Sequence, residues 1–109
     1  MSVPLAGSAP LTLRLHRNHL YVEAALFDAH FPHVQSIGLL RKGSDLLILP
    51  LTASEAGGFY VKQVNARGDR AIHAADFFRR NGIDENHEYE LTAWPQPSMA
   101  GFIIPSLFA

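Results

Sequence analysis

Residues 21–27 read Tyr21-Val22-Glu23-Ala24-Ala25-Leu26-Phe27, and residues 71–77, fifty positions later (71 − 21 = 50), read Ala71-Ile72-His73-Ala74-Ala75-Asp76-Phe77. Each of these stretches is followed by an apolar run that ends in proline, at Pro50 and at Pro105. A repeat of this size predicts one barrel built from two related halves. It says more about architecture than about activity.

Hydrophobic periodicity predicts the same order of elements in both halves: two strands, a short helix and two strands. In the first half, strands are expected over 11–15, 20–22, 34–40 and 46–49, and a helix over 24–31. In the second half, strands are expected over 59–64, 70–72, 88–94 and 100–104, and a helix over 74–81. Pro32 should end the first helix, and Gly82 should provide a left-handed cap for the second. The predicted fold is mainly β with two short helices, in which duplicated β-β-α-β-β halves form one pseudo-two-fold barrel.

Length and composition fit one folded domain. The chain has 109 residues, of which 48% are hydrophobic and 17% are charged, so it has enough apolar surface to offset the ordering entropy of a core. Residues 1–10 are expected to form a loose N-terminal arm, and residues 11–109 a single barrel domain. Its halves should cover about 11–51 and 59–105, and Thr52 to Gly58 should connect them because Gly57-Gly58 weakens any regular element.

Several functional classes are disfavoured by what the sequence lacks. The chain has no cysteine, which excludes disulfides, thiolate zinc sites and thiol nucleophiles and is compatible with a reducing cytosol. No stretch approaches the roughly 20 apolar residues of a membrane-spanning helix, and the N-terminus lacks the pattern of a secretory signal. We therefore expect a cytoplasmic protein with no membrane partner. The formal net charge of −1 does not predict a cationic surface.

A family resemblance is carried by four segments of the second half, at residues 64–68, 70–72, 76–83 and 89–91. With them, Val61 to Pro105 resembles the swapped-hairpin domain of AbrB-like (SpoVT/AbrB) transcription factors. In that domain a strand, a glycine-containing turn, a second strand, a short helix ending in Gly-Ile and two more strands follow in this order. One departure is His73, which stands where the family usually has proline.

The first half is a weaker match to the same pattern. Phe31-Pro32-His33-Val34 stands where the second half has Asn81-Gly82-Ile83, so the glycine cap is missing. If residues 11–51 are a degenerate copy, the whole chain resembles a tandem of two modules of the MraZ type. A double-psi barrel has a similar order of elements and is the alternative topology.

The resemblance implies DNA contacts by four arginines, Arg67, Arg70, Arg79 and Arg80, because the family uses arginines on the turn, the next strand and the helix. The planar guanidinium suits this role, since it pairs in a bidentate manner with phosphate or guanine. However, four carboxylates lie among these positions and would offset the attraction to phosphate: Asp69, Asp76, Asp84 and Glu85. Alternatively, Arg79 and Arg80 simply favour the C-terminal end of a helix on a solvated face.

Two histidine pairs suggest a metal site as a further alternative. His16 and His19, and His30 and His33, each have two intervening residues, and ten residues separate the pairs. Imidazole nitrogens are good ligands for zinc, nickel or copper, so four of them from two turns could close a site. Histidines at turns are also commonly solvated or hydrogen-bonded to the backbone.

The common catalytic spacings are missing, so we expect neither an enzyme nor a bound cofactor. Most aromatic residues, including Trp94, are expected in the core. The apolar tail from Gly101 to Ala109 needs cover from its own barrel or from a second chain, and we expect self-association through it. The sequence therefore favours a small noncatalytic binding module with a regulatory or assembly role and an unidentified protein partner. A DNA-binding regulator and a histidine-based metal-binding protein are the alternatives.

Overall fold

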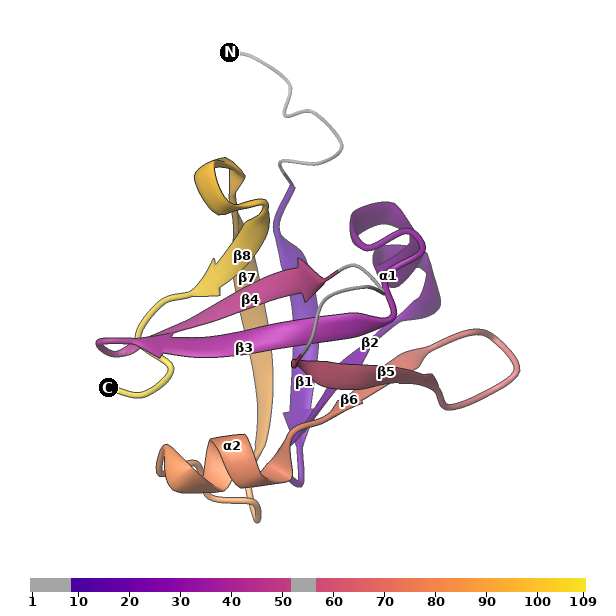
Figure 1. Ribbon diagram of the computed structural model, residues 1–109. Helices are drawn as coiled ribbons and strands as arrows, with labels where there is room; N and C mark the ends of the chain where they lie inside the picture. Colours follow the sequence, from indigo (N-terminus) through magenta and orange to yellow (C-terminus); the bar gives the residue numbers. More distant parts are fainter. Residues whose placement is uncertain (1–8, 52–56) are drawn as a thin grey trace.

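The computed structural model of the chain describes residues 9–51 and 57–109 (Figure 1). Most of the predicted arm, residues 1–8, and most of the predicted connection, residues 52–56, lie outside the described residues. The strands and helices are β1 (Leu11–His16), β2 (His19–Val22), α1 (Ala24–His30), β3 (Ser36–Lys42), β4 (Asp45–Leu51), β5 (Phe59–Gln63), β6 (Arg70–His73), α2 (Ala75–Arg80), β7 (Glu88–Gln96) and β8 (Gly101–Ile104). A 3₁₀ turn, η2 (Pro97–Met99), joins the last two strands. The element order agrees with the sequence prediction.

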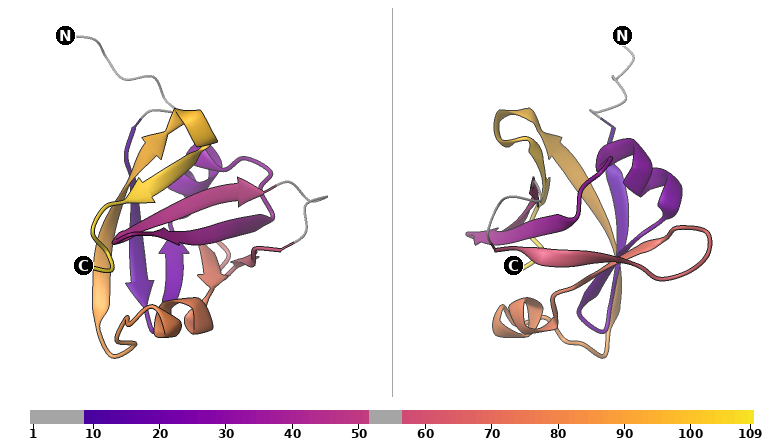
Figure 2. Two further views of the ribbon diagram at one scale, coloured as in Figure 1. Left: turned by 60° about the vertical axis from the view of Figure 1, so that its left-hand side comes forward. Right: turned by 45° about the vertical axis from the view of Figure 1, so that its right-hand side comes forward.

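The strands form a closed barrel in the order β1-β2-β6-β5-β3-β4-β8-β7 (Figures 1 and 2). All neighbouring strands are antiparallel. The prediction of a mainly β barrel with two short helices is confirmed. Within residues 9–51 and 57–109, closure leaves no unpaired edge strand, so every strand is held by hydrogen bonds to a neighbour on each side.

The strand pairs of the first and second halves correspond. β1 pairs with β2 as β5 pairs with β6, and β3 pairs with β4 as β7 pairs with β8. The halves are joined by β1–β7 and β3–β5, and by β2–β6 and β4–β8. The pairing differs in extent, because β1 and β7 pair from Leu11↔Ala93 to His16↔Glu88, whereas β3 and β5 pair only at Ser36↔Tyr60 and Ile37↔Phe59.

The core fills the barrel with the inward side chains of every second strand residue. In β1, Leu11, Leu13 and Leu15 are buried, and the residues between them are exposed. Each helix adds one buried aromatic ring, Phe27 from α1 and Phe78 from α2. These two are 51 residues apart (78 − 27 = 51), one more than the spacing of the sequence repeat.

Backbone hydrogen bonds explain why the two buried rings are 51 residues apart and not 50. The N–H of Phe27 donates to the carbonyl of Glu23 at 2.9 Å, and the N–H of Phe78 donates to that of Ala74 at 3.2 Å. The two phenylalanines therefore hold the same position in their helices. Phe77, which the sequence repeat aligned with Phe27, is only partly buried and packs edge to face against Phe78 at 5.3 Å between ring centroids.

Local turn chemistry fixes the chain reversals. Arg17 and Asn18 both have positive φ, at 50° and 61°, as a two-residue hairpin turn of the primed type requires. Gly82 has a φ of 83°, and its N–H donates to the carbonyl of Arg79 at 3.1 Å. The predicted glycine cap of α2 is therefore present.

Neither helix in the described part of the chain is long and apolar enough to cross a membrane.

The C-terminal tail folds back on its own barrel. The N–H of Phe108 donates to the carbonyl of Ser44 at 2.9 Å, and that of Ser106 donates to Asp45 Oδ1 at 2.8 Å. The guanidinium carbon of Arg41 lies 5.0 Å from the centroid of the Phe108 ring. The sequence allowed this tail to be covered either by its own barrel or by a second chain. In the structure, its own barrel covers it.

One aromatic residue does not join the core as expected. Trp94 is 49% exposed, because Leu91 and Ala93 take the inward positions of β7 and the alternation of the strand turns position 94 outward. On the outer surface Trp94 lies opposite Ile103 of β8. The expectation of a buried Trp94 was therefore wrong.

Candidate functional site

The four arginines of the DNA-binding prediction lie in two separate places. Arg67 belongs to the loop between β5 and β6, and Arg70 is the first residue of β6. Arg79 and Arg80 belong to the last turn of α2. The β5–β6 loop and α2 project from different sides of the barrel in Figure 1 and in the right-hand view of Figure 2. The structure therefore does not gather the four guanidinium groups on one surface.

Protein groups already engage each of these arginines. Arg67 Nη2 lies 3.0 Å from Asp69 Oδ2, and Arg79 contacts Asp76 Oδ1 at 2.8 Å and Glu85 Oε2 at 3.6 Å. These contacts place three of the four carboxylates noted in the sequence directly on the arginines. The guanidinium of Arg70 stands 4.9 Å over the ring of Phe27 and donates to the carbonyl of Gly68, and Arg80 Nε donates to the carbonyl of Asp76 at 3.4 Å.

The histidines of the metal-site prediction are also divided between two places. His16 and His19 face each other across the β1–β2 turn, whereas His30 ends α1 and His33 follows it at the opposite end of the barrel (Figure 1). Within residues 9–51 and 57–109, no three His, Cys, Asp or Glu side chains gather in an arrangement that could hold a metal ion. The structure therefore does not bring the two histidine pairs together.

The stacking partner of His19 is a residue that the sequence did not indicate. The His19 ring stacks on that of His73 with 4.4 Å between centroids, because the two residues are direct cross-strand neighbours in β2 and β6. Burial, and then the nearby His73, lower the pKa of His19 below the ordinary range of a histidine. The Nδ1 atom of His19 is buried without a hydrogen-bond partner among the described residues. Folding therefore favours the neutral form of the His19 imidazole.

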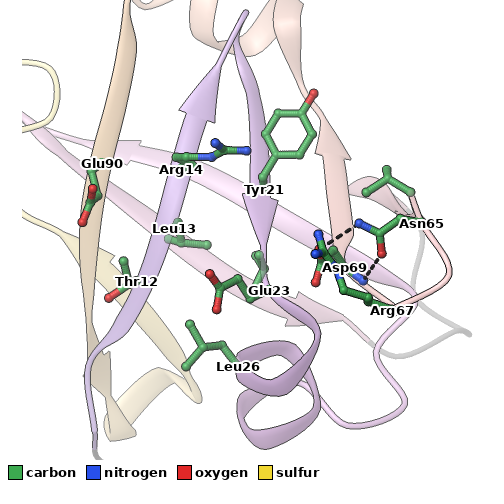
Figure 3. Close-up of a pocket in the computed structure, with 12 residues that line it drawn as sticks. Thr12, Leu13, Arg14, Tyr21, Glu23, Leu26, Asn65, Arg67, Asp69 and Glu90 are labelled. Carbon is green, nitrogen blue, oxygen red and sulfur yellow. Dashed lines mark hydrogen bonds and ion pairs between the residues drawn. The ribbon is translucent and has the colours of Figure 1, made fainter.

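An open groove of about 690 Å³ lies on the outer surface of the barrel (Figure 3). Strands β1, β2 and β7 form its floor and one wall. The start of α1 and the β5–β6 loop form the other wall. Side chains that line it include Arg14, Tyr21, Glu23, Leu26, Arg67 and Glu90. The volume lies in the range of ligand pockets, and polar or charged side chains make up eight of the twelve lining residues.

The floor of the groove follows from strand register. Arg14 of β1 lies directly opposite Glu90 of β7 on one side and Tyr21 of β2 on the other. All three side chains point outward because Leu13 and Leu15 take the inward positions of β1. The guanidinium carbon of Arg14 stands 5.7 Å from the centroid of the Tyr21 ring. An acid, a base and an aromatic ring therefore form one row across three strands.

The loop wall is held in place by Asp69. Its Oδ2 accepts hydrogen bonds from Asn65 Nδ2 at 2.8 Å and Arg67 Nη2 at 3.0 Å, and its Oδ1 accepts one from the N–H of Ala24 at 2.9 Å. The backbone N–H of Asp69 donates to Asn65 Oδ1 at 3.2 Å. The hydrogen bonds from Asn65 and Ala24, together with Arg67, lower the pKa of Asp69 below the ordinary range of an aspartate. The loop and the start of α1 are therefore one connected wall.

The charged side chains of the groove differ in whether they form ion pairs. Arg14 Nη1 lies 3.3 Å from Glu88 Oε1 and Arg67 lies against Asp69, so both cations have a carboxylate partner. Glu23 and Glu90 line the groove, and neither forms an ion pair with another side chain of the described residues. The groove thus combines apolar surface with two carboxylates that have no cationic partner in the described chain.

Sequence reasoning did not identify the groove. The sequence singled out Arg67 only as a DNA contact and Asp69 only as a nearby carboxylate, and Arg14 and Glu90 were visible only as outward positions of strands, which are usually solvated. Their proximity depends on the pairing of β1 with β7, which joins the two ends of the domain. Comparisons with known protein families, with curated proteins and with solved structures find no match to this chain.

Proposed function

We propose that this protein is a small noncatalytic binding module that acts in regulation or assembly by holding a segment of a partner protein. The observation that carries the proposal is the groove of about 690 Å³ between β1, β2, β7, the start of α1 and the β5–β6 loop. Its hydrogen-bonding, charged and apolar side chains are the components of a recognition surface on a rigid support.

We further propose that the barrel is a duplicated, pseudo-two-fold structure of the swapped-hairpin type, as the AbrB-like resemblance implies. The correspondence of strand pairs between the halves supports this. The equivalent hydrogen bonds of Phe27 and Phe78 support it as well. Under this proposal the β1–β2 turn and the β5–β6 loop are counterparts that diverged, and only the longer β5–β6 loop forms a groove wall.

The arginine contacts favour a protein partner over DNA. A guanidinium that already faces a carboxylate gains less from a phosphate, since the phosphate must compete with a contact of 3.0 Å at Arg67 or 2.8 Å at Arg79. Fold alone does not settle function. We therefore place DNA binding second to protein interaction, and we place metal binding third because the histidine pairs lie apart.

A matched pair of tyrosines provides the test. Tyr21 lines the groove and Tyr60 is 70% exposed on β5, outside the groove lining. Peptides of nine residues would be selected from a random displayed library on the immobilised protein, and their affinities measured for the wild type, Tyr21→Ala and Tyr60→Ala. We expect selected peptides to bind Tyr21→Ala about tenfold more weakly, because an aromatic anchor in a recognition site often contributes more than 1 kcal/mol. Tyr60→Ala should bind them as the wild type does.

Two results would contradict the proposal. One is loss of peptide binding in Tyr60→Ala but not in Tyr21→Ala. The other is failure to select any peptide, together with a salt-dependent mobility shift of random duplex DNA at physiological ionic strength, which is the signature of phosphate contacts.

A further inference from the structure

The two carboxylates without cationic partners, Glu23 and Glu90, indicate the chemistry of the segment that the groove would bind. This inference rests on the proposed function, because it concerns the same groove. We propose that the groove binds a basic, extended segment of a partner protein, with one Lys or Arg side chain at Glu90, a second at Glu23, and apolar side chains against Tyr21 and Leu26.

The balance of charge in the groove supports a cationic ligand. Three acids, Glu23, Asp69 and Glu90, and two bases, Arg14 and Arg67, line it. Asp69 forms an ion pair with Arg67, and Arg14 forms one with Glu88, which does not line the groove. With Glu88 included there are four acids and two bases, so the local charge is −2 (2 − 4 = −2). An anionic ligand would meet two arginines whose charges are offset by these carboxylates, whereas a cationic ligand finds both Glu23 and Glu90 accessible.

The position of the carboxylates suits an extended chain. Glu90 comes from β7 at one side of the floor, and Glu23 lies at the end of β2 beside α1 (Figure 3). Thr12 of β1, an outward residue, lies between them in the same view. A segment that crosses the strands over this floor therefore meets both carboxylates in turn. Alternate side chains of an extended segment point to the same side, which allows two basic residues to face the groove.

The apolar part of the groove adds contact area without charge. Leu26 and Tyr21 are partly buried, and Val64 of the loop wall is 47% exposed. Aliphatic stems of lysine and arginine pack well on such surfaces while their charged heads stay in water. The combination favours a peptide with both basic and apolar residues over a bare cation.

The test uses three blocked pentapeptides of one length. They are acetyl-Lys-Ala-Leu-Ala-Lys-amide, in which both lysines and the leucine point to one side, and the analogues with glutamine or with glutamate in place of every lysine. Dissociation constants would be measured by calorimetry in 50 mM salt. We expect the lysine peptide to bind on the order of tenfold more tightly than the glutamine analogue, because each exposed ion pair contributes at most about fivefold. The glutamate analogue should bind most weakly.

Variants of the protein assign the effect to the two carboxylates. The double variant Glu23→Gln with Glu90→Gln should bind the lysine peptide no better than the glutamine analogue. Glu85→Gln is the matched control, because Glu85 is an exposed carboxylate that already contacts Arg79 and lies outside the groove lining. It should leave all three affinities unchanged, and raising the salt to 500 mM should weaken only the binding of the lysine peptide.

The possible failures are distinguishable. Equal binding of the lysine and glutamine peptides, lost in Tyr21→Ala, would overturn the charge inference and leave the protein-interaction function standing. Tightest binding of the glutamate peptide would also overturn the inference. Spermidine binding as tightly as the lysine peptide would show that a small polyamine suffices, and would overturn the inference of a protein segment. If no peptide binds and the library selection also fails, both the inference and the proposed function are wrong.

Discussion

The side chain of Asp69 accepts a hydrogen bond from the backbone N–H of Ala24 at 2.9 Å, although the two residues are 45 positions apart in the sequence. Ala24 is the first residue of α1, and its N–H has no partner within the helix. Asp69 therefore caps a helix that belongs to the other half of the chain. The same contact fixes the β5–β6 loop against α1 and so defines the shape of the groove.

Acid should weaken this link. The lowered pKa of Asp69 means that its ionised form is stabilised by folding. That contribution is complete above the unfolded pKa of about 3.9 and is lost as the pH falls through the lower folded pKa. We expect Asp69→Asn to be less stable than the wild type at pH 7, and the difference to shrink below about pH 4. Urea unfolding at several pH values measures this, and a difference that is independent of pH would contradict it.

The stacked histidines predict a second pH dependence. Folding stabilises the neutral form of His19, because burial and His73 lower its pKa. Between this folded pKa and the unfolded value of about 6.5, the unfolded chain binds more protons, so stability decreases as the pH falls through that window. The shift can be read from the ring C–H resonances of His19 during an NMR titration. A midpoint at or above about 6.5 would exclude the effect.

Gly101 should not tolerate a side chain. A Cβ at this position would lie 2.5 Å from the carbonyl oxygen of Ile48, which is backbone and cannot rotate away. We expect Gly101→Ala to lower the free energy of unfolding by about 1–3 kcal/mol, as overpacking does. Gly38→Ala is the matched control, because its Cβ would meet Leu49 at an ordinary 3.6 Å. Equal stability of the two variants in urea unfolding would contradict this account of the β4–β8 contact.

The 51-residue spacing of the helix aromatics predicts which phenylalanine of α2 matters most. Phe78 is 0% exposed, whereas Phe77 is partly buried. Phe78→Ala should cost about 3–5 kcal/mol of unfolding free energy, and Phe77→Ala should cost less. The measurement is chemical denaturation of both variants. A larger loss for Phe77→Ala would show that the sequence repeat, with its spacing of fifty, describes the helix packing better.

Local patterns allowed most of the fold to be predicted. The alternation of Leu11, Leu13 and Leu15 with exposed residues marks β1, and Gly82 marks the end of α2, because both signals depend only on neighbours in the sequence. The strand order could not be obtained in this way, since the β1–β7 pairing brings together opposite ends of the domain. Trp94 was misplaced for a related reason: hydrophobicity suggested the core, but the phase of β7 turned it outward.

The candidate site was harder to predict than the fold. Arg67 and Arg79 stand out in the sequence as potential phosphate ligands, but only the folded chain shows that Asp69 and Asp76 contact them. Glu23 and Glu90 do not stand out in the sequence as site residues. Their significance comes from the groove between them and from cations that pair elsewhere, which are properties of the assembled barrel.

Chemical-shift mapping on the isotope-labelled protein tests the central claim most directly. Library-selected peptides and random duplex DNA would be titrated separately at physiological ionic strength. We predict that the peptides shift the amide resonances of Thr12, Arg14, Glu23, Asn65 and Glu90, around the groove. DNA should leave the spectrum unchanged. Shifts that DNA induces around Arg79 and Arg80, with none from the peptides at the groove, would contradict the account.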